Sequence, residues 1–245
     1  MSIMFAYIAR CHITLHDNLY YASHEFGRFY ETEKYLHNYG LTYALGLVRP
    51  APPFFTASQE PRYREDLYAT EVAYDYYVTP ARPLHVDFAL NTFKLIDAHY
   101  YNVPVKESRN RVVFGRAKEI TPGSTFEYFV YSQIPRTLPH WIRLGKWLAK
   151  AEMSYKWYSV GTGEAPIVSP PEAQRIACPL NPLDIADQQL ATFDVVMMPP
   201  SSLLVNVSIV GPCCCLPAEP LFHDEPSKDI HVPIGMRYFE GVVKT

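Results

Sequence analysis

The stretch HDNLYYASHEFGRFYETEKYLHNYGLTYALGLV, residues 16–48, holds the end of a strand, an aromatic and basic loop, and the first clear helix. Ahead of it, residues 3–15 are mostly apolar at odd positions, while the even positions are polar from Arg10 onward. This alternation predicts a half-buried strand that runs into the stretch. Residues 16–30 are too irregular for a helix and contain more aromatic residues than a solvent-exposed loop without a function would, so we interpret them as a binding loop.

A helix is predicted to begin near Thr32, a permitted N-cap residue, with Glu31 and Glu33 placed against the positive end of the helix dipole. Its buried stripe is expected at spacings of three and four residues and comprises Leu36, Tyr39, Tyr43 and Leu47. The other side is expected to face solvent or a partner and carries Lys34, His37, Asn38 and Thr42. Prolines from position 50 onward end the helix.

The composition indicates a globular, mainly β protein. The chain has 245 residues and is 48% hydrophobic, enough for a substantial core in one large domain or two closely joined ones. Its 22 prolines are nearly twice the usual share of about 5%, which favours extended segments over long helices. We expect a soluble, cytoplasmic protein with no membrane partner, because a signal-peptide pattern and a long apolar run are both missing.

Motifs for metals and cofactors are weak. The five cysteines include no C-x-x-C pair, and the run at residues 213–215 would point to alternating faces of a strand, so buried reduced thiols are expected. The segment from Gly161 to Gly163 lacks the third glycine of a dinucleotide loop, and there is no H-E-x-x-H. Neither a metal nor a cofactor is predicted.

Positive charge is concentrated in the middle of the chain, although the formal net charge is −3. Residues 106–156 carry 10 basic and 4 acidic side chains, a net of +6. Residues 1–105 carry 8 basic and 11 acidic side chains, and residues 157–245 carry 4 basic and 10 acidic ones, so both flanks are acidic. This distribution predicts a localised site for a polyanion.

Extended segments predominate after the first helix. The segment KESRNRVVFGRAK, residues 106–118, is predicted to be a basic finger made of two short strands or one exposed hairpin arm. Residues 126–133 are apolar on both faces and predict a central strand. Residues 138–144 predict a short helix that Gly145 ends.

Four more strands are predicted at residues 152–160, 190–198, 203–210 and 231–243, the middle two forming a hairpin. This order does not fit a parallel sheet with alternating helices. It fits an α+β fold with a ferredoxin-like or RRM-like core in residues 1–160, although the order of the elements leaves the topology open. Residues 161–245 add antiparallel β structure as a smaller portion packed with the core as one unit.

Three basic and aromatic pieces are candidates for binding single-stranded RNA. Lys and Arg neutralise phosphates, while Tyr, Trp and Arg planes stack on unpaired bases. Three such pieces in an otherwise acidic chain favour this function over a merely solvated charged surface. The candidates are Tyr21, His24, Arg28, Tyr30, Lys34, Tyr35, His37 and Asn38 at the front, Arg109, Arg111, Arg116 and Lys118 in the finger, and Arg143, Lys146, Trp147, Lys150 and Lys156 around Gly145.

Two runs also resemble a known family. HDNLYYASHEFGRFYETEKYLHNYGLTYALGL (residues 16–47) and PHWIRLGKWLAKAEM (residues 139–153) resemble the Cas-five class subunit of the type I-D CRISPR interference complex (Cascade), a RAMP-superfamily protein. The resemblance implies an RRM-like fold and a non-catalytic subunit that caps the 5′ handle of the CRISPR RNA in antiviral defence. It implies the Cas-seven class backbone subunit and the large subunit as partners, and leaves open a contact with target DNA near the protospacer-adjacent motif.

Two other functions stay open from the residues themselves. His12 and His16 fall on one face of a strand and, with Arg10, Tyr20 or a lysine, could make a metal-independent endoribonuclease that processes precursor CRISPR RNA through the RNA's own 2′-hydroxyl. The resemblance assigns cleavage to a separate subunit. Alternatively, the chain is a structural adaptor whose basic block meets an acidic protein surface.

Overall fold

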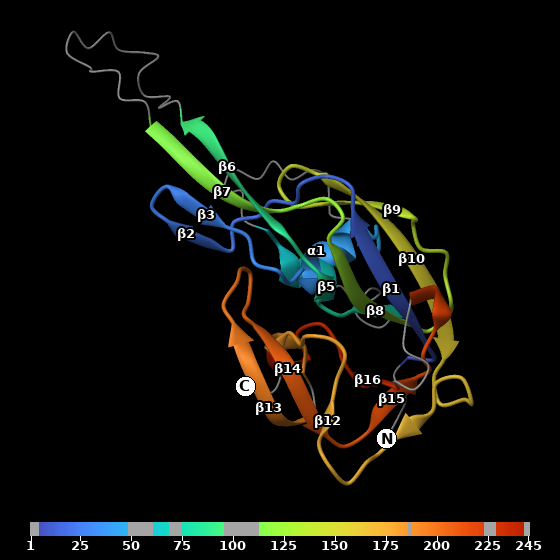
Figure 1. Cartoon of the computed structure of the whole chain (residues 1–245). Coiled ribbons are helices and arrows are strands. Elements are labelled where there is room, and N and C mark those ends of the chain that lie inside the picture. The colour runs from blue at the N-terminus through green and yellow to red at the C-terminus, as the bar shows by residue number, and fades with distance from the viewer. Residues whose placement is uncertain are drawn as a thin grey trace, which may run out of the picture.

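Strands dominate the computed structural model, which describes residues 5–48, 61–68, 75–95, 113–185, 188–222 and 229–242 (Figure 1). The α-helices of these residues, α1 (Asn38–Ala44) and α2 (Tyr63–Tyr68), are both short. The protein is therefore mostly β, as its proline content indicated.

A central antiparallel sheet has the strand order β4-β8-β1-β10-β9, and β5 also pairs with β8. At its centre, Cys11 of β1 pairs with Tyr128 of β8 and Tyr155 of β10. The predicted first strand is confirmed, but its middle is buried on both faces, since Arg10 is only 2% exposed. The strands are β1 (Tyr7–Leu15), β4 (Tyr76–Val78), β5 (Arg82–His85), β8 (Thr125–Ser132), β9 (Trp141–Leu144) and β10 (Ala149–Ser159).

The first helix begins later than the sequence predicts. His37 is the N-cap of α1, and its Nδ1 accepts the N–H of Tyr39 at 3.3 Å. The prediction of Thr32 as N-cap is wrong, because the residues before it form strand β3. The Thr32 hydroxyl is buried and donates to the carbonyl of Tyr21 at 2.8 Å.

Two separate apolar cores cover α1. Leu41 packs into the core on one face of the central sheet, whereas Tyr39 belongs to the core shared with the C-terminal part of the chain. Asn38 and Thr42 are 0% exposed. The prediction that these two residues face solvent or a partner is wrong, because both sides of the helix are packed within the chain.

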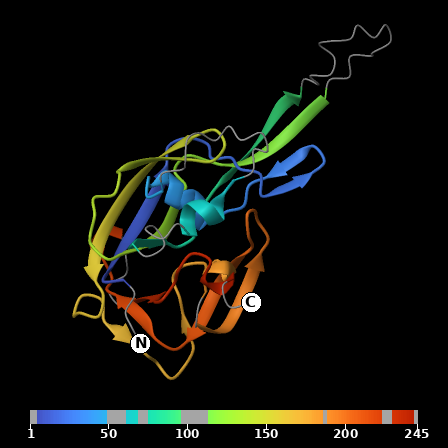
Figure 2. The same cartoon turned by 180° about the vertical axis from the view of Figure 1, so that it is seen from behind.

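A second, four-stranded sheet projects from the central sheet as an arm (Figure 1, Figure 2). Its order is β2-β3-β7-β6, and β3 pairs in parallel with β7, placing Phe29 opposite Arg116. Residues 113–118 of the predicted finger thus lie in a hairpin arm, whereas Arg109 and Arg111 lie outside the described residues. The strands are β2 (His24–Phe26), β3 (Phe29–Glu31), β6 (Phe88–Leu95) and β7 (Val113–Ile120).

The predicted helix at residues 138–144 is wrong. Residues 141–144 form the edge strand β9, in which Trp141 and Arg143 are exposed and Ile142 and Leu144 are buried. This alternation has the period of a strand, and pairing with β10 completes the backbone hydrogen bonds. Leu148 is 63% exposed in the turn between the two strands.

The C-terminal part forms two further three-stranded sheets, ordered β11-β15-β16 and β12-β14-β13. The predicted hairpin is confirmed, whereas the last strand ends at Pro233, earlier than expected. Cys213, Cys214 and Cys215 are free thiols in β15. The elements are β11 (Ile167–Val168), β12 (Gln174–Arg175), β13 (Gln189–Val196), β14 (Leu203–Val210), β15 (Cys213–Leu216) and β16 (Ile230–Pro233), with 3-10 turns η2 (Pro182–Asp184), η3 (Pro220–Phe222) and η4 (Glu240–Val242).

One hydrophobic core crosses residue 160. It joins Ile8 and Tyr77 of the central sheet to Leu204, Cys213 and Tyr238 of the C-terminal part. The described residues on the two sides of the predicted domain boundary therefore share their packing. The division at residue 160 itself stays a prediction.

Candidate nucleic-acid interface

A cavity of about 980 Å³ lies between α1 and the β9–β10 hairpin. Small and apolar side chains form its walls, among them Gly40, Leu41 and Ala44 from α1 and Ile142 and Leu144 from β9. Met198 and Pro199, in the loop between β13 and β14, also line it. Segments far apart in the sequence thus share one concave surface at the β9 edge of the central sheet.

The charged lining of this cavity is cationic and consists of Arg62, Arg143, Lys146 and Lys150. Among the described residues that line it, none is Asp or Glu. A carboxylate does lie nearby, since Asp17 Oδ2 is 3.8 Å from Arg143 Nη1. Both side chains of this pair are more than half exposed, so water screens it and an anion can compete for the guanidinium.

Exposed aromatic rings accompany these cations. Trp147 is 56% exposed and stacks on Tyr20, with ring centroids 4.4 Å apart. Trp141 is 46% exposed, and Lys150 Nζ lies 3.9 Å from its ring centroid. Aromatic faces beside cations are the combination that holds unpaired bases and their phosphates.

Gly145 permits the close approach that positions the hairpin turn. Its φ is 71°, and a Cβ at this residue would lie 2.6 Å from both the Tyr20 carbonyl oxygen and Leu19 Cδ1. The adjacent Lys146 N–H donates to the same Tyr20 carbonyl at 2.9 Å. Gly145 therefore turns a β-hairpin instead of ending a helix, and it sets Lys146 at the cavity.

The front piece contributes two wall residues to the cavity, Tyr21 and His37. The Tyr21 hydroxyl donates to the carbonyls of Glu33 and Tyr35. Burial lowers the pKa of His37 to about 4, against the effect of its contact with Ser201, so the imidazole is neutral near pH 7. Neither side chain supplies a charge for an RNA phosphate.

Asn38 does not reach this surface. Its Nδ2 donates to Asp184 Oδ2 at 2.7 Å, and the side chain is 0% exposed. The structure therefore places Asn38 in the core, apart from Arg28 and Tyr30, with which the sequence grouped it.

The arm brings together a second set of the predicted residues. Arg28 is exposed after Gly27 in the β2–β3 turn, and its carbonyl accepts the N–H of the equally exposed Arg116 at 2.8 Å. Tyr30 lies beside Phe93 of β6, with ring centroids 5.9 Å apart. Front loop and finger are thus one surface.

Four other predicted residues contact neighbouring groups of this chain. Lys118 is 2.6 Å from Glu31 Oε1, and exposed Lys34 sits 5.8 Å from the Tyr35 ring centroid. Lys156 is six residues beyond Lys150 along β10, roughly 20 Å away at the rise of a strand, and it pairs with Glu219. The structure therefore does not bring Lys156 to the cavity.

Among the residues that line the cavity, sequence reasoning missed Arg62, Tyr63 and Trp141. Trp141 alternates with Arg143 along the run WIRL, which was a usable strand signal. Arg62 and Tyr63 belong to a charged run whose position on the fold depends on α2, so the sequence carried no comparable signal for them.

His12 and His16, the two histidines of the alternative endoribonuclease function, contact different carboxylates. His12 Nε2 is 3.1 Å from Glu127 Oε1, and the ring of Phe222 covers the imidazole with centroids 4.2 Å apart. His16 Nε2 is 3.1 Å from Glu152 Oε2. Four residues along a strand separate the histidines by about 13 Å, too far for both to act on one phosphodiester.

Comparisons with known proteins place the chain among the CRISPR-associated proteins. The family model described as type I-D CRISPR-associated protein Cas5/Csc1 matches residues 6–241. The chain therefore belongs to this family, which confirms the resemblance of its two sequence runs. No curated protein sequence matches it.

One similar solved structure is a chain of the type III-B Cmr-beta complex bound to cognate target RNA and AMPPnP. The TM-score is 0.36 with 9% identity, over 83% of this chain and 85% of that chain. A likeness this low carries no conclusion. Separately, none of the helices in the described part of the chain is long and apolar enough to span a membrane.

Proposed function

We propose that this type I-D Cas5-family chain is a non-catalytic RNA-binding subunit that caps the single-stranded 5′ handle of the CRISPR RNA in a cytoplasmic interference complex. The observation that carries the proposal is the cavity beside α1, whose described lining combines four cations with aromatic side chains and contains no carboxylate. Cations bind phosphates of any sequence, and exposed rings such as Trp147 stack on bases.

The arm suits a protein neighbour in the same assembly, for which we propose the Cas-seven class backbone subunit or the large subunit. Phe26, Leu90 and Phe114 are 62%, 56% and 54% exposed on its strands, beside the cations Arg28 and Arg116. Exposed apolar side chains in one sheet favour a protein contact. Contact with target DNA near the protospacer-adjacent motif stays an expectation from the resemblance.

We also infer that the central sheet is a reduced ferredoxin-like core. Strands β4-β8-β1-β10 are mutually antiparallel, and α1 follows β1, as in a β-α-β-β-α-β unit. The connection from β8 to β10, residues 133–148, holds strand β9 where that unit has its second helix. The missing helix leaves the β9 edge open to form the cavity.

The double variant Lys146→Ala/Lys150→Ala is expected to weaken handle RNA binding by about 1–2 kcal/mol at low salt, because two phosphate contacts are lost. The slope of log affinity against log salt should flatten by about 1.4, at about 0.7 per contact for single strands. Because phosphate contacts carry no sequence information, the loss should be the same for a scrambled handle. Fluorescence anisotropy with the full chain, over a salt series and with both RNAs, measures the loss of affinity, the change in salt slope and the dependence on handle sequence.

The matched control is Arg136→Ala/Arg175→Ala, which removes the same charge from exposed residues outside the cavity lining. It should retain most of the affinity. Equal affinity and slope for the Lys146/Lys150 variant and the wild type would contradict RNA binding at the cavity and assign this surface to a protein neighbour.

We expect no cleavage of precursor CRISPR RNA when the full chain is incubated with it in EDTA. The separation and separate pairing of His12 and His16 support this expectation. Denaturing gels with end-labelled precursor give the readout. Specific cleavage by the wild type that disappears in a His16→Ala or His12→Ala variant would establish the endoribonuclease alternative instead.

A further inference from the structure

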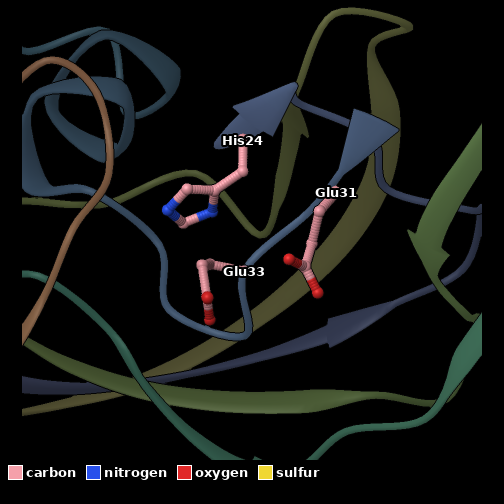
Figure 3. A group of neighbouring side chains, drawn as sticks. All are labelled: His24, Glu31 and Glu33. Atoms are coloured by element: carbon pink, nitrogen blue, oxygen red, sulfur yellow. The ribbon is translucent and has the colours of Figure 1, made fainter. Parts of the chain in front are cut away.

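The base of the β2–β3 hairpin gathers one imidazole and two carboxylates (Figure 3). The ligand atoms of His24, Glu31 and Glu33 all lie within 4.8 Å of one another. His24 and Glu31 are direct partners across the two strands. Glu33 follows Glu31 by two residues, so in extended chain both side chains project to the same side.

The backbone that carries these three side chains is held by hydrogen bonds from the neighbouring segment. Ser23 accepts the N–H of Glu33 on its hydroxyl oxygen at 2.8 Å, and both its N–H and its hydroxyl donate to the Glu31 carbonyl at 2.8 Å. The Tyr21 hydroxyl donates to the Glu33 carbonyl. The positions of the two glutamates are therefore set by the fold, which lowers the entropy cost of binding an ion.

A second observation points to a ligand at this place. His24 Nδ1 is a buried polar atom, and no hydrogen-bond partner for it exists among the described residues. Nearly all buried nitrogen and oxygen atoms in proteins have a partner. The two nearby side chains are carboxylates, and Lys118, 2.6 Å from Glu31 Oε1, supplies one positive charge against their two negative charges.

We propose that His24, Glu31 and Glu33 bind a divalent transition-metal ion of the Zn²⁺ type. Such an ion accepts an imidazole nitrogen together with carboxylate oxygens, at bonds of about 2.0–2.2 Å, whereas Mg²⁺ and Ca²⁺ prefer oxygen ligands alone. Lys118 takes one oxygen of Glu31, at 2.6 Å, and the carboxylate has a second oxygen for the metal.

The ion would tie the hairpin to the chain that leads into α1. The hairpin carries exposed Arg28 at its tip, and the segment after Glu33 leads to His37 at the cavity. Metal binding therefore joins the two strands of the hairpin to Glu33, four residues before His37. This inference rests on the hairpin geometry alone and does not depend on RNA binding.

Isothermal titration of ZnCl₂ into the EDTA-stripped, desalted full chain tests the proposal. We expect one Zn²⁺ per chain at this site, and at least a tenfold weaker affinity in His24→Ala and in Glu33→Gln. The matched control is Glu25→Gln, an exposed glutamate next to His24 on the opposite face of β2, which should bind like the wild type. Zinc should raise the melting temperature of the wild type and the control more than that of the two site variants.

Cobalt distinguishes this site from the free thiols of the chain. Co²⁺ bound by His24 and the glutamates should give visible d–d bands without the thiolate-to-cobalt charge-transfer band that Cys ligands add. Absence of stoichiometric Zn²⁺ binding, unchanged affinity in His24→Ala, or a thiolate band in the Co²⁺ spectrum would each overturn the proposal.

Discussion

Replacing Glu127 by Gln is expected to lower the free energy of unfolding by about 3–5 kcal/mol, the usual cost of breaking a buried ion pair from one side. Glu127 is 0% exposed, and its Oε1 lies 2.6 Å from the guanidinium of Arg10, which is 2% exposed. Its Oε2 lies 2.5 Å from Arg82. Glutamine removes the negative charge that neutralises the buried Arg10.

The same cluster makes stability depend on acid pH. Burial alone would raise the pKa of Glu127, but the hydrogen bond with His12 and the charges of Arg82 and Arg10 outweigh it and lower the pKa from 4.5 to about 2. A depressed pKa contributes stability that is present above pH 4.5 and is lost as pH falls toward 2. The loss is on the order of 3 kcal/mol.

Urea unfolding followed by tryptophan fluorescence at pH 7 measures the Glu127→Gln effect. The control, Glu152→Gln, removes a carboxylate that is 56% exposed and paired with His16, and should change stability by less than about 0.5 kcal/mol. If Glu127→Gln does not fold, the double variant Arg10→Met/Glu127→Leu should recover a folded protein, because it removes both buried charges. A Glu127→Gln variant as stable as the wild type would contradict a stabilising role of the buried Arg10–Glu127 ion pair.

Replacing Asp184 by Ala is expected to destabilise the protein by about 3–5 kcal/mol, because several buried donors lose their acceptor together. The Asp184 carboxylate accepts hydrogen bonds from Asn38 Nδ2 at 2.7 Å, from the Phe239 N–H at 3.0 Å and from the Tyr77 hydroxyl at 3.2 Å. Asp184 belongs to η2, and its donors lie on α1, β4 and the C-terminal segment. This one side chain therefore links the C-terminal part to the central sheet.

Asp184 has the opposite pH effect from Glu127. Burial raises its pKa from 3.8 to about 7, against its hydrogen bonds from Phe239, Asn38, Tyr77 and Tyr39. A raised carboxyl pKa contributes stability that is fully present below pH 3.8 and is lost as pH rises toward 7. The protein should therefore lose about 2–3 kcal/mol from this group between pH 5 and pH 7.

Unfolding free energies of the wild type and Asp184→Asn at pH 5, 6 and 7 test this effect. The variant cannot ionise, so the difference between the two proteins should change by about 2–3 kcal/mol across the series. Asp194→Asn, at an exposed residue that accepts from Asn206, is the control and should follow the wild type. A constant difference between the wild type and Asp184→Asn would exclude Asp184 as the titrating group.

Part of the candidate site could be predicted from residue types, because cationic and aromatic residues are visible in the sequence. Lys146, Trp147 and Lys150 were predicted just after Gly145, and Lys146 and Lys150 do line the cavity, although the run WIRL before them is a strand and not the predicted helix. Asn38 was misplaced because its polarity predicted exposure, whereas Asp184, distant in the sequence, provides a buried partner. Arg62 became part of the cavity only through the position of α2.

The sequence by itself determined the strands that have a local residue pattern, namely β1, β8, β10 and the β13–β14 hairpin, and it determined the family through two specific runs. Only the tertiary structure decided that residues 141–144 are an edge strand, since pairing with β10 supplies the hydrogen bonds that a helix would have made internally. It also decided which polar residues are buried, because α1 is covered on two sides by segments remote in sequence. Burial and strand pairing are long-range properties, and residue pattern within one segment cannot encode the partner.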